Sequence, residues 1–279
     1  MNTTTLNFTT PQVSTNSTPD FTVLTYLGIG FYCIHFLFGL PTHSYIFWLI
    51  VTGRGSGVAS EFFILNLSVC EFVDCLNSLF LVLSVWFSSL MSAAAFFEGF
   101  SLTGRPLFQC LMCVERYLAV VYPVTFLKYK PLRYRVICST AAWTICLCSC
   151  LVCGFTMVFS SIVHMWFILI QFLLVPSLQL FCLSAVLRAL KQSGPGERGR
   201  EKTKDSHVKR RAFHLILITT VSMIIMYIPY TISGFLTIVT QQYINAFWLI
   251  GLICYVLAGF VQPVLYLHST GRLSFICSP

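Results

Sequence analysis

Long apolar segments separated by short polar ones run along most of the chain. A helix needs roughly 20 consecutive apolar residues to cross the hydrocarbon core of a bilayer. Segments of that length lie at about residues 23–52, 59–83, 92–122, 132–157, 163–190, 212–239 and 243–267. Strands of a membrane β-barrel would give alternating segments of about ten residues, which are shorter and less continuously apolar. The pattern therefore predicts an all-α membrane protein, a seven-transmembrane helix bundle over residues 23–267.

The composition agrees with this pattern. Hydrophobic residues make up 57% of the 279 residues and charged residues only 9%. Helices this apolar have no polar face to present to water, which excludes a water-soluble domain with a single core. We expect a multi-pass protein whose immediate surroundings are the lipid bilayer.

The positive charges predict the orientation of the bundle. Apart from Arg105 and Arg116, the 17 Lys and Arg residues lie in or next to the connections between spans 1 and 2, 3 and 4, and 5 and 6, or after span 7. Cytoplasmic loops carry such an excess. The N-terminus is therefore predicted to lie outside and the C-terminus in the cytoplasm. This topology explains the net charge of +8, so no nucleic-acid partner is expected.

The polar residues 1–22 form the predicted extracellular tail. Three glycosylation sequons begin at Asn2, Asn7 and Asn16, on the side that the charges place outside. No apolar segment of a signal peptide directly follows Met1, so span 1 is expected to target the chain itself.

Several ionisable and polar residues lie inside the predicted spans. Glu71 and Asp74 are three residues apart and share one face of span 2. Two buried acids need a nearby arginine or a proton, and Arg105 is the basic residue at mid-depth. We predict a Glu71–Arg105 pair, with pairing of Arg105 to Asp74 or Glu98 as the alternative. His43 in span 1 and Gln262 in span 7 complete the predicted intramembrane polar network.

Short motifs occur in a fixed order along the spans. They are Asn66-Leu67-Ser68-Val69-Cys70-Glu71, Glu115-Arg116-Tyr117, Trp143, Pro176, Tyr227-Ile228-Pro229-Tyr230 and Gln262-Pro263-Val264-Leu265-Tyr266. In this order, on seven spans, they make nearly the whole chain resemble the rhodopsin-like (class A) G-protein-coupled receptor family, as a divergent member.

The resemblance implies a function at the plasma membrane. An extracellular ligand, a small molecule or a peptide, would act through the bundle on a heterotrimeric G protein. Helix 6 would move outward about Pro229, Arg116 would be released from Glu115, and Tyr266 would rotate inward. Pro229 and Pro263 remove backbone hydrogen bonds, which favours hinges there, although both can also be simple packing kinks. The implied switch residues are Glu115, Arg116, Tyr117, Tyr227, Pro229, Pro263 and Tyr266.

The departures from the family pattern fall at switching positions. Glu71 stands where the family usually has Asp, and Arg105 stands where a small polar residue helps to hold a sodium ion, so its guanidinium is expected to replace that ion. His43, Gln262 and Tyr227 also replace the usual residues. No disulfide is predicted, because Met91 stands at the expected helix 3 position. An alternative is therefore a degenerate receptor with weak or no signalling that acts as a trafficking or dimerisation partner. A transporter or channel is less favoured, since internal repeats are not evident.

Glu98 lies where the resemblance places the acid that receives amine ligands. It is a candidate counter-ion for a cationic ligand. The competing interpretation is an internal partner for Arg105, seven residues further along the helix.

The cytoplasmic segments are the most hydrophilic. Residues 191–211 are predicted to form a basic linker, cytoplasmic loop 3. Residues 268–279 form a short tail, with a predicted short amphipathic helix 8 and Cys277 as a palmitoylation candidate.

The sequence contains no hydrolase, metal-ligand or phosphate-loop motif. We therefore expect no enzymatic activity, no metal site and no cofactor.

Overall fold

The computed structural model describes residues 19–53, 61–122, 124, 132–159, 161–192, 201–240 and 245–269. Within these ranges the elements are helices, with no strand. They are α1 (Pro19–Ile34), η1 (His35–Gly39), α2 (Leu40–Val51), α3 (Phe62–Ser84), α4 (Leu90–Val121), α6 (Leu132–Phe159), α7 (Ser161–Gln192), α8 (Glu201–Thr240), α9 (Asn245–Gly259) and α10 (Val261–Ser269).

The first and last spans are each built from more than one element. In span 1 a π-helical turn, η1, joins α1 to α2 just before Pro41. Proline has no N–H to donate and its ring crowds the preceding turn, so the helix widens there. In span 7 a break at Phe260 separates α9 from α10, three residues before Pro263. Pro229, in contrast, lies inside the continuous helix α8.

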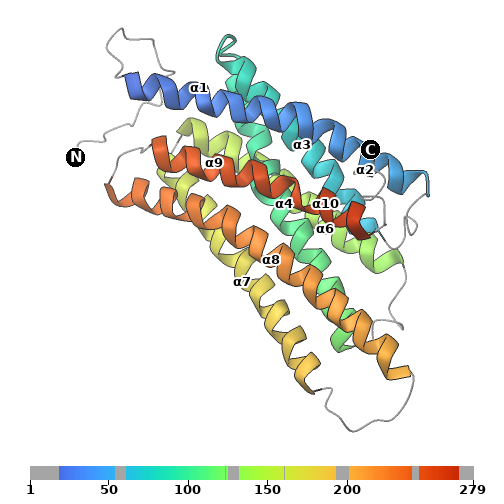
Figure 1. The fold of residues 1–279 in the computed structure, drawn as a ribbon. Coiled ribbons are helices and arrows are strands. Elements are labelled where there is room, and N and C mark those ends of the chain that lie inside the picture. Colours follow the sequence, from blue (N-terminus) through green and yellow to red (C-terminus); the bar gives the residue numbers. More distant parts are fainter. Residues whose placement is uncertain are drawn as a thin grey trace.

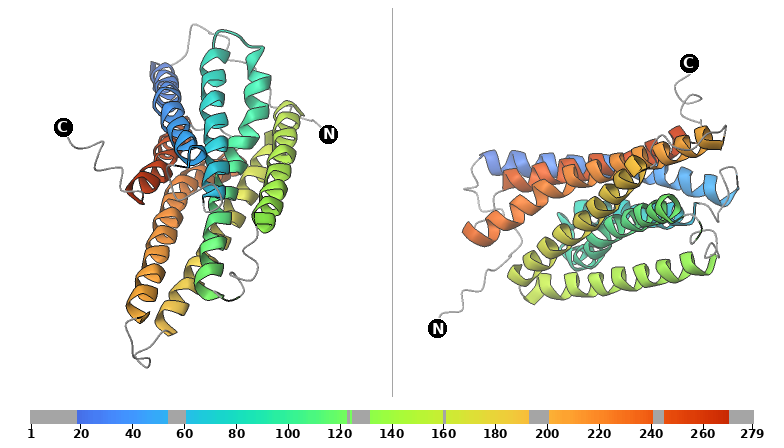
Figure 2. Two further views of the ribbon diagram at one scale, coloured as in Figure 1. Left: turned by 90° about the vertical axis from the view of Figure 1, so that its right-hand side faces the viewer. Right: turned by 90° about the horizontal axis from the view of Figure 1, so that it is seen from below.

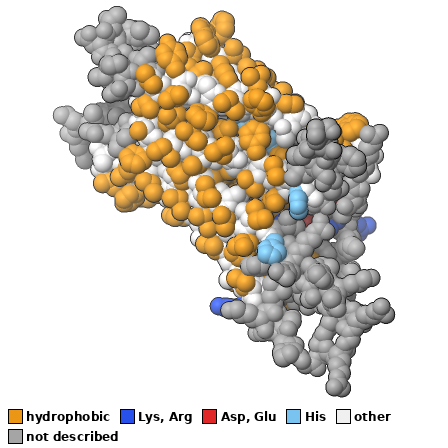
Figure 3. Space-filling view, in the orientation of Figure 1, with side chains coloured by type: hydrophobic (Ala, Val, Ile, Leu, Met, Phe, Trp, Pro, Cys, Tyr) orange, Lys and Arg blue, Asp and Glu red, His pale blue; other side chains and the backbone are white. Residues whose placement is uncertain are grey.

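Six of these stretches are long and apolar enough to cross a membrane. They are Val23–Val51, Phe62–Ser84, Arg133–Thr156, Ile162–Arg188, Ile216–Thr240 and Asn245–His268. Hydrophobic side chains cover most of the described face of the molecule in Figure 3, and the few Lys and Arg side chains that show there lie at its right-hand and lower left edges. A surface of this kind suits a lipid environment.

The seventh span is α4, which carries Glu98, Arg105, Glu115 and Arg116 and is less apolar than the others. It runs through the middle of the bundle and contacts α3, α6, α7 and α8 (Figures 1 and 2). Its central position explains why a charged helix is tolerated, since its polar side chains face protein instead of lipid. The fold is therefore a seven-transmembrane helix bundle, as predicted.

Gly99 allows α4 to pack closely on α6. A Cβ at this position would lie 2.5 Å from the Cys150 nitrogen and 2.7 Å from the Ser149 carbonyl carbon, both backbone atoms. Backbone cannot yield as a flexible side chain can, so a larger residue would push the two helices apart. Phe100, Phe108, Cys146 and Cys150 pack in the same interface as part of one hydrophobic cluster.

Most predicted spans agree closely with the helices. One difference concerns the linker predicted at residues 191–211, because α8 already begins at Glu201 and the second half of that linker is helical. The sequons at Asn2, Asn7 and Asn16, the predicted helix 8 and Cys277 lie outside the described residues.

Candidate functional site

Arg105 lies at the centre of a buried polar network and is 2% exposed. Its Nε donates to Glu71 Oε1 at 2.5 Å, and its Nη2 donates to Glu71 Oε2 at 2.6 Å and to Asp74 Oδ2 at 3.0 Å. Its Nη1 lies 2.9 Å from the Tyr255 carbonyl oxygen and 3.5 Å from Met226 Sδ. These contacts account for all five N–H donors of a guanidinium. The two-point contact with Glu71 is the strong bidentate kind.

Tyr255 of α9 ties Arg105 and Asp74 together. The guanidinium carbon lies 4.0 Å from the centre of the Tyr255 ring, a cation–π contact. The Tyr255 hydroxyl lies 2.6 Å from Asp74 Oδ2 and 3.2 Å from the Ser101 carbonyl oxygen. The network thus joins α3, α4 and α9.

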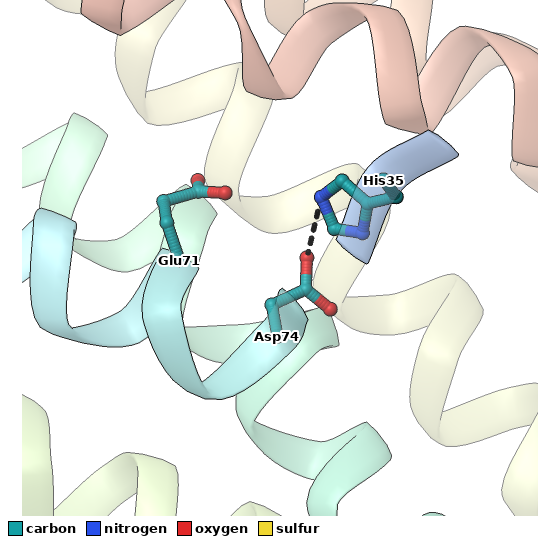
Figure 4. Close-up of side chains that lie close together, drawn as sticks. All are labelled: His35, Glu71 and Asp74. Carbon is teal, nitrogen blue, oxygen red and sulfur yellow. Dashed lines mark ion pairs between the residues drawn. The ribbon is translucent and has the colours of Figure 1, made fainter. Parts of the chain in front are cut away.

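Two histidines of span 1 lie beside the two acids of α3 and complete the network. His35 Nε2 lies 3.7 Å from Asp74 Oδ2, and His35 Nδ1 lies 2.8 Å from Ser78 Oγ. Figure 4 shows His35 from η1 directed at Asp74, with Glu71 one turn away on α3. His43 Nε2 lies 3.8 Å from Glu71 Oε2. Each acid therefore has one histidine beside it.

The π-helical turn explains why both histidines reach the same helix. In a regular α-helix, positions eight residues apart point about 80° away from each other. A π-helical turn absorbs one extra residue, which reduces this difference to about 20°. His35 begins η1 and His43 follows in α2, so the π-helical turn lies between them and both face α3.

Ligand atoms of His35, Glu71 and Asp74 lie within 4.8 Å of one another, a spacing that fits a metal ion. Arg105 Nη2, however, already binds both carboxylates. A metal ion would have to displace this guanidinium, so the three residues do not fit a metal site while Arg105 is in place.

Gly259 lets α9 end directly against the guanidinium. A Cβ there would lie 3.0 Å from Arg105 Nη2 and 3.7 Å from Glu71 Oε2. Any larger residue would have to shift the ion pair.

The remaining polar candidates lie apart from this network. Gln262 Nε2 is 3.4 Å from Thr219 Oγ1 of α8. Glu98 is half-buried on α4 and lies seven residues, about two helical turns, before Arg105. Because the donors of Arg105 are directed to Glu71, Asp74, Tyr255 and Met226, the pairing of Arg105 with Glu98 that the sequence left open does not form in the structure.

Glu115, at the predicted cytoplasmic end of α4, binds an arginine of the next helix. Arg135 Nε donates to Glu115 Oε1 at 2.9 Å, and Arg135 Nη2 contacts the same oxygen. The sequence suggested Arg116 as the partner of this carboxylate and did not identify Arg135. Tyr117 faces α7 instead of α6, with its ring 6.1 Å from that of Tyr122 and 6.3 Å from that of Phe181.

Tyr266 on α10 donates a hydrogen bond from its hydroxyl to Glu61 Oε2 at 2.8 Å. Both side chains are buried, and Tyr266 packs with Ile46, Leu49 and Ile50 of α2. Glu61, the residue before α3, lies near the start of the span predicted at residues 59–83. It was missed because the sequence does not show which distant side chain meets it.

Tyr227 on α8, two residues before Pro229, is buried in the cluster that joins α4, α6, α7, α8 and α9. Its ring centre lies 4.4 Å from that of Phe172 on α7. A shift of α8 would therefore change the packing of Tyr227 against its neighbours.

Comparison with known proteins adds evidence that is independent of this geometry. Residues 43–266 match the family described as 7 transmembrane receptor (rhodopsin family). The chain is 27% identical to human Chemokine XC receptor 1 over 227 residues, covering 74% of this chain and 63% of that protein. It is 24% identical to human C-C chemokine receptor type 8 over 244 residues, covering 77% and 64%.

A third similar protein is Hydroxycarboxylic acid receptor 2 of Rattus norvegicus, 25% identical over 224 residues, covering 70% of this chain and 59% of that protein. The chain thus spans less than two thirds of the length of these three relatives. Each is a receptor by name, in agreement with the expectation that the chain is not an enzyme.

Proposed function

The chain belongs to the rhodopsin family of 7 transmembrane receptors, and we propose that it transduces an extracellular ligand signal to a heterotrimeric G protein at the plasma membrane. The observation that carries this proposal is the placement of Glu115-Arg116-Tyr117 at the end of the central helix α4, beside α6 and α7. The distribution of Lys and Arg predicts that this end is cytoplasmic.

In the proposed mechanism, α8 swings outward at its cytoplasmic end. Pro229 lies inside α8 and leaves one backbone carbonyl without its usual donor, which lowers the cost of bending there. The movement would open a crevice between α4, α7 and α8, in which Arg116 meets the G protein.

Arg135 takes part in this mechanism by sharing the Glu115 carboxylate. A carboxylate that binds Arg135 attracts the neighbouring Arg116 less strongly, because its charge is already partly balanced. We propose that Arg135 favours the active arrangement of Arg116 and is a positioning residue for the switch.

In the network around Arg105, the guanidinium of the chain itself takes the place of a bound cation. A guanidinium that binds both carboxylates leaves no site for a sodium ion between them. Sodium is therefore proposed to have no effect on the receptor.

The ligand is proposed to carry a cationic group that Glu98 receives. Two of the similar proteins are chemokine receptors by name and one is a hydroxycarboxylic acid receptor. A carboxylate ligand needs a cationic anchor, but residues 212–269 contain no Lys or Arg, and Arg105 is fully engaged. The charges thus favour a peptide or a small amine over a carboxylic acid.

The second candidate is a receptor with weak or no signalling. The observation that favours it is the network itself, which ties α3, α4 and α9 through hydrogen bonds of a buried arginine. A rearrangement that breaks these bonds would leave buried charges unpaired, at a cost of about 3–5 kcal/mol.

Purified receptor in nanodiscs provides a direct test. The protein is mixed with each class of purified Gα·βγ heterotrimer, and the rate of GTPγS binding is compared with that of discs without receptor. The proposed function predicts faster exchange on at least one class. Unchanged rates on every class, with and without a panel of amines and basic peptides, would favour the second candidate.

A further inference from the structure

Three neighbouring helices each bury a polar side chain at the same depth of the bundle. Gln109 on α4 is 2% exposed, Gln179 on α7 is 0% exposed and Thr220 on α8 is 1% exposed. The three helices contact one another pairwise. We call these three residues the polar layer.

Their common depth follows from an apolar cluster beneath them. Cys113, Cys182 and Ile216 pack together, one from each helix. Gln109 precedes Cys113 by four residues, Gln179 precedes Cys182 by three, and Thr220 follows Ile216 by four. Since α8 runs opposite to α4 and α7 in the bundle, each polar residue lies one turn above its partner in the cluster, on the same face.

The polar layer is covered on its other side as well. Met223, three residues after Thr220, packs with Met226 and Tyr227 in the cluster that includes Leu102 and Phe172. The polar layer therefore lies between two apolar clusters and has no route to bulk solvent through either.

Several polar atoms of this layer have no hydrogen-bond partner among the described residues. They are Gln109 Oε1, both polar atoms of the Gln179 amide, and Thr220 Oγ1. An unpaired amide or hydroxyl in an apolar interior is energetically costly. Each of the three residues shares a helix face with members of both apolar clusters, so all three face the interface of α4, α7 and α8. A shared ligand in that interface can satisfy all of them.

The chemistry of the polar layer selects that ligand. The set contains two amides and a hydroxyl, which both donate and accept hydrogen bonds and carry no charge. A cation would find no carboxylate in it and an anion no arginine. Water both donates and accepts, and buried waters bind where two to four polar partners converge.

We propose that α4, α7 and α8 enclose a site that binds water molecules between Gln109, Gln179 and Thr220. Tyr227 sets its upper limit. Tyr227 lies two turns after Thr220 along α8, and its hydroxyl is buried without a partner in the described part of the chain.

The site has a consequence that rests on the proposed function. If α8 moves away from α4 and α7, the movement disrupts contacts with bound water instead of direct hydrogen bonds between the helices. Water can exchange partners during such a shift, so the separation of the helices leaves no buried polar group unpaired.

Radiolytic footprinting of the purified receptor tests the site without any G protein. Hydroxyl radicals formed from bound water oxidise the side chains next to that water, and mass spectrometry locates the oxidised residues. Cys113 and Cys182 lie next to the polar layer, while Cys146 and Cys150 are equally buried in the apolar cluster between α4 and α6. The two pairs of thiols are thus matched in burial and differ in whether they lie next to the polar layer.

The proposal predicts severalfold faster oxidation at Cys113 and Cys182 than at Cys146 and Cys150. The double variant Gln109→Leu/Gln179→Leu should remove this difference. The control variant Gln171→Leu should leave it intact, because the Gln171 amide donates to Thr103 Oγ1 at 3.1 Å, away from the polar layer.

Equal oxidation of all four thiols in the wild type would overturn the proposal. Fast oxidation that persists at Cys113 and Cys182 in a folded double variant would also overturn it. If the double variant fails to fold, the comparison of the four thiols in the wild type still tests the proposal. Neither result depends on whether the receptor activates a G protein.

Discussion

Arg105 of α4 binds both carboxylate oxygens of Glu71 on α3, at 2.5 and 2.6 Å, with both side chains buried in the middle of the bundle. Removing Arg105 leaves two buried acids without their cation, and removing Glu71 leaves Arg105 with Asp74 as its remaining carboxylate partner. Breaking a buried ion pair in this way costs about 3–5 kcal/mol. We expect Arg105→Met and Glu71→Leu each to lower the thermal midpoint of detergent-solubilised receptor strongly.

The double variant Glu71→Leu/Arg105→Met should recover much of this loss. It removes both charges, and Asp74 keeps the Tyr255 hydroxyl and His35 as neighbours. Fluorescence-detected melting provides the measurement. Additive losses in the double variant would show that the two residues do not act as a pair.

The contact between Glu115 and Arg135 predicts opposite effects on basal G-protein activation. Arg135→Ala should lower it, since the Glu115 carboxylate then attracts Arg116 alone, whereas Glu115→Gln should raise it. A partly exposed pair contributes about 1 kcal/mol, so changes of roughly fivefold are expected. The double variant should behave like Glu115→Gln. Higher activity in Arg135→Ala would refute the positioning role.

The hydrogen bond from Tyr266 to Glu61 predicts a coupling between these residues. A hydrogen bond to a charged group contributes about 1.5–3 kcal/mol. Tyr266→Phe removes only the hydroxyl and should destabilise the receptor by about that amount. In a Glu61→Ala background the same change should have a much smaller effect, which thermal melting of the four proteins would measure. Equal effects in both backgrounds would exclude the coupling.

The position of Arg105 predicts insensitivity to sodium. Replacing NaCl by an equal concentration of N-methylglucamine chloride should change neither the thermal midpoint nor GTPγS exchange. The variant Arg105→Ser opens the space beside Glu71 and Asp74 and should make stability depend on sodium. A sodium effect on the wild type equal to that on this variant would contradict the prediction.

The sequence was sufficient for the spans and for the main charges. Hydrophobic segments of membrane length predict the helices directly, and two acids on one face of span 2 require the basic residue at the same depth. Glu71, Asp74, Arg105 and His43 are accordingly found together.

The parts that were missed depend on helix rotation. His35 and Tyr255 lie in apolar helices, where the sequence does not show which face turns inward. The π-helical turn at His35–Gly39 also changes which side chains of span 1 face α3. Pro41 is the one residue in the sequence that points to such a turn. Arg135 could not be chosen among the neighbouring basic residues, because this choice depends on where α6 begins relative to Glu115.

Arg116 is proposed to couple this receptor to a G protein. The most direct measurement compares basal Gα–Gβγ dissociation, by energy transfer in cells, for the wild type, Arg116→Ala and Arg188→Ala at matched surface expression. Arg188 is a basic residue near the same end of α7 and serves as the control. Arg116→Ala is expected to abolish the signal, and Arg188→Ala is expected to preserve most of it. An equal signal from wild type and Arg116→Ala would contradict the proposal.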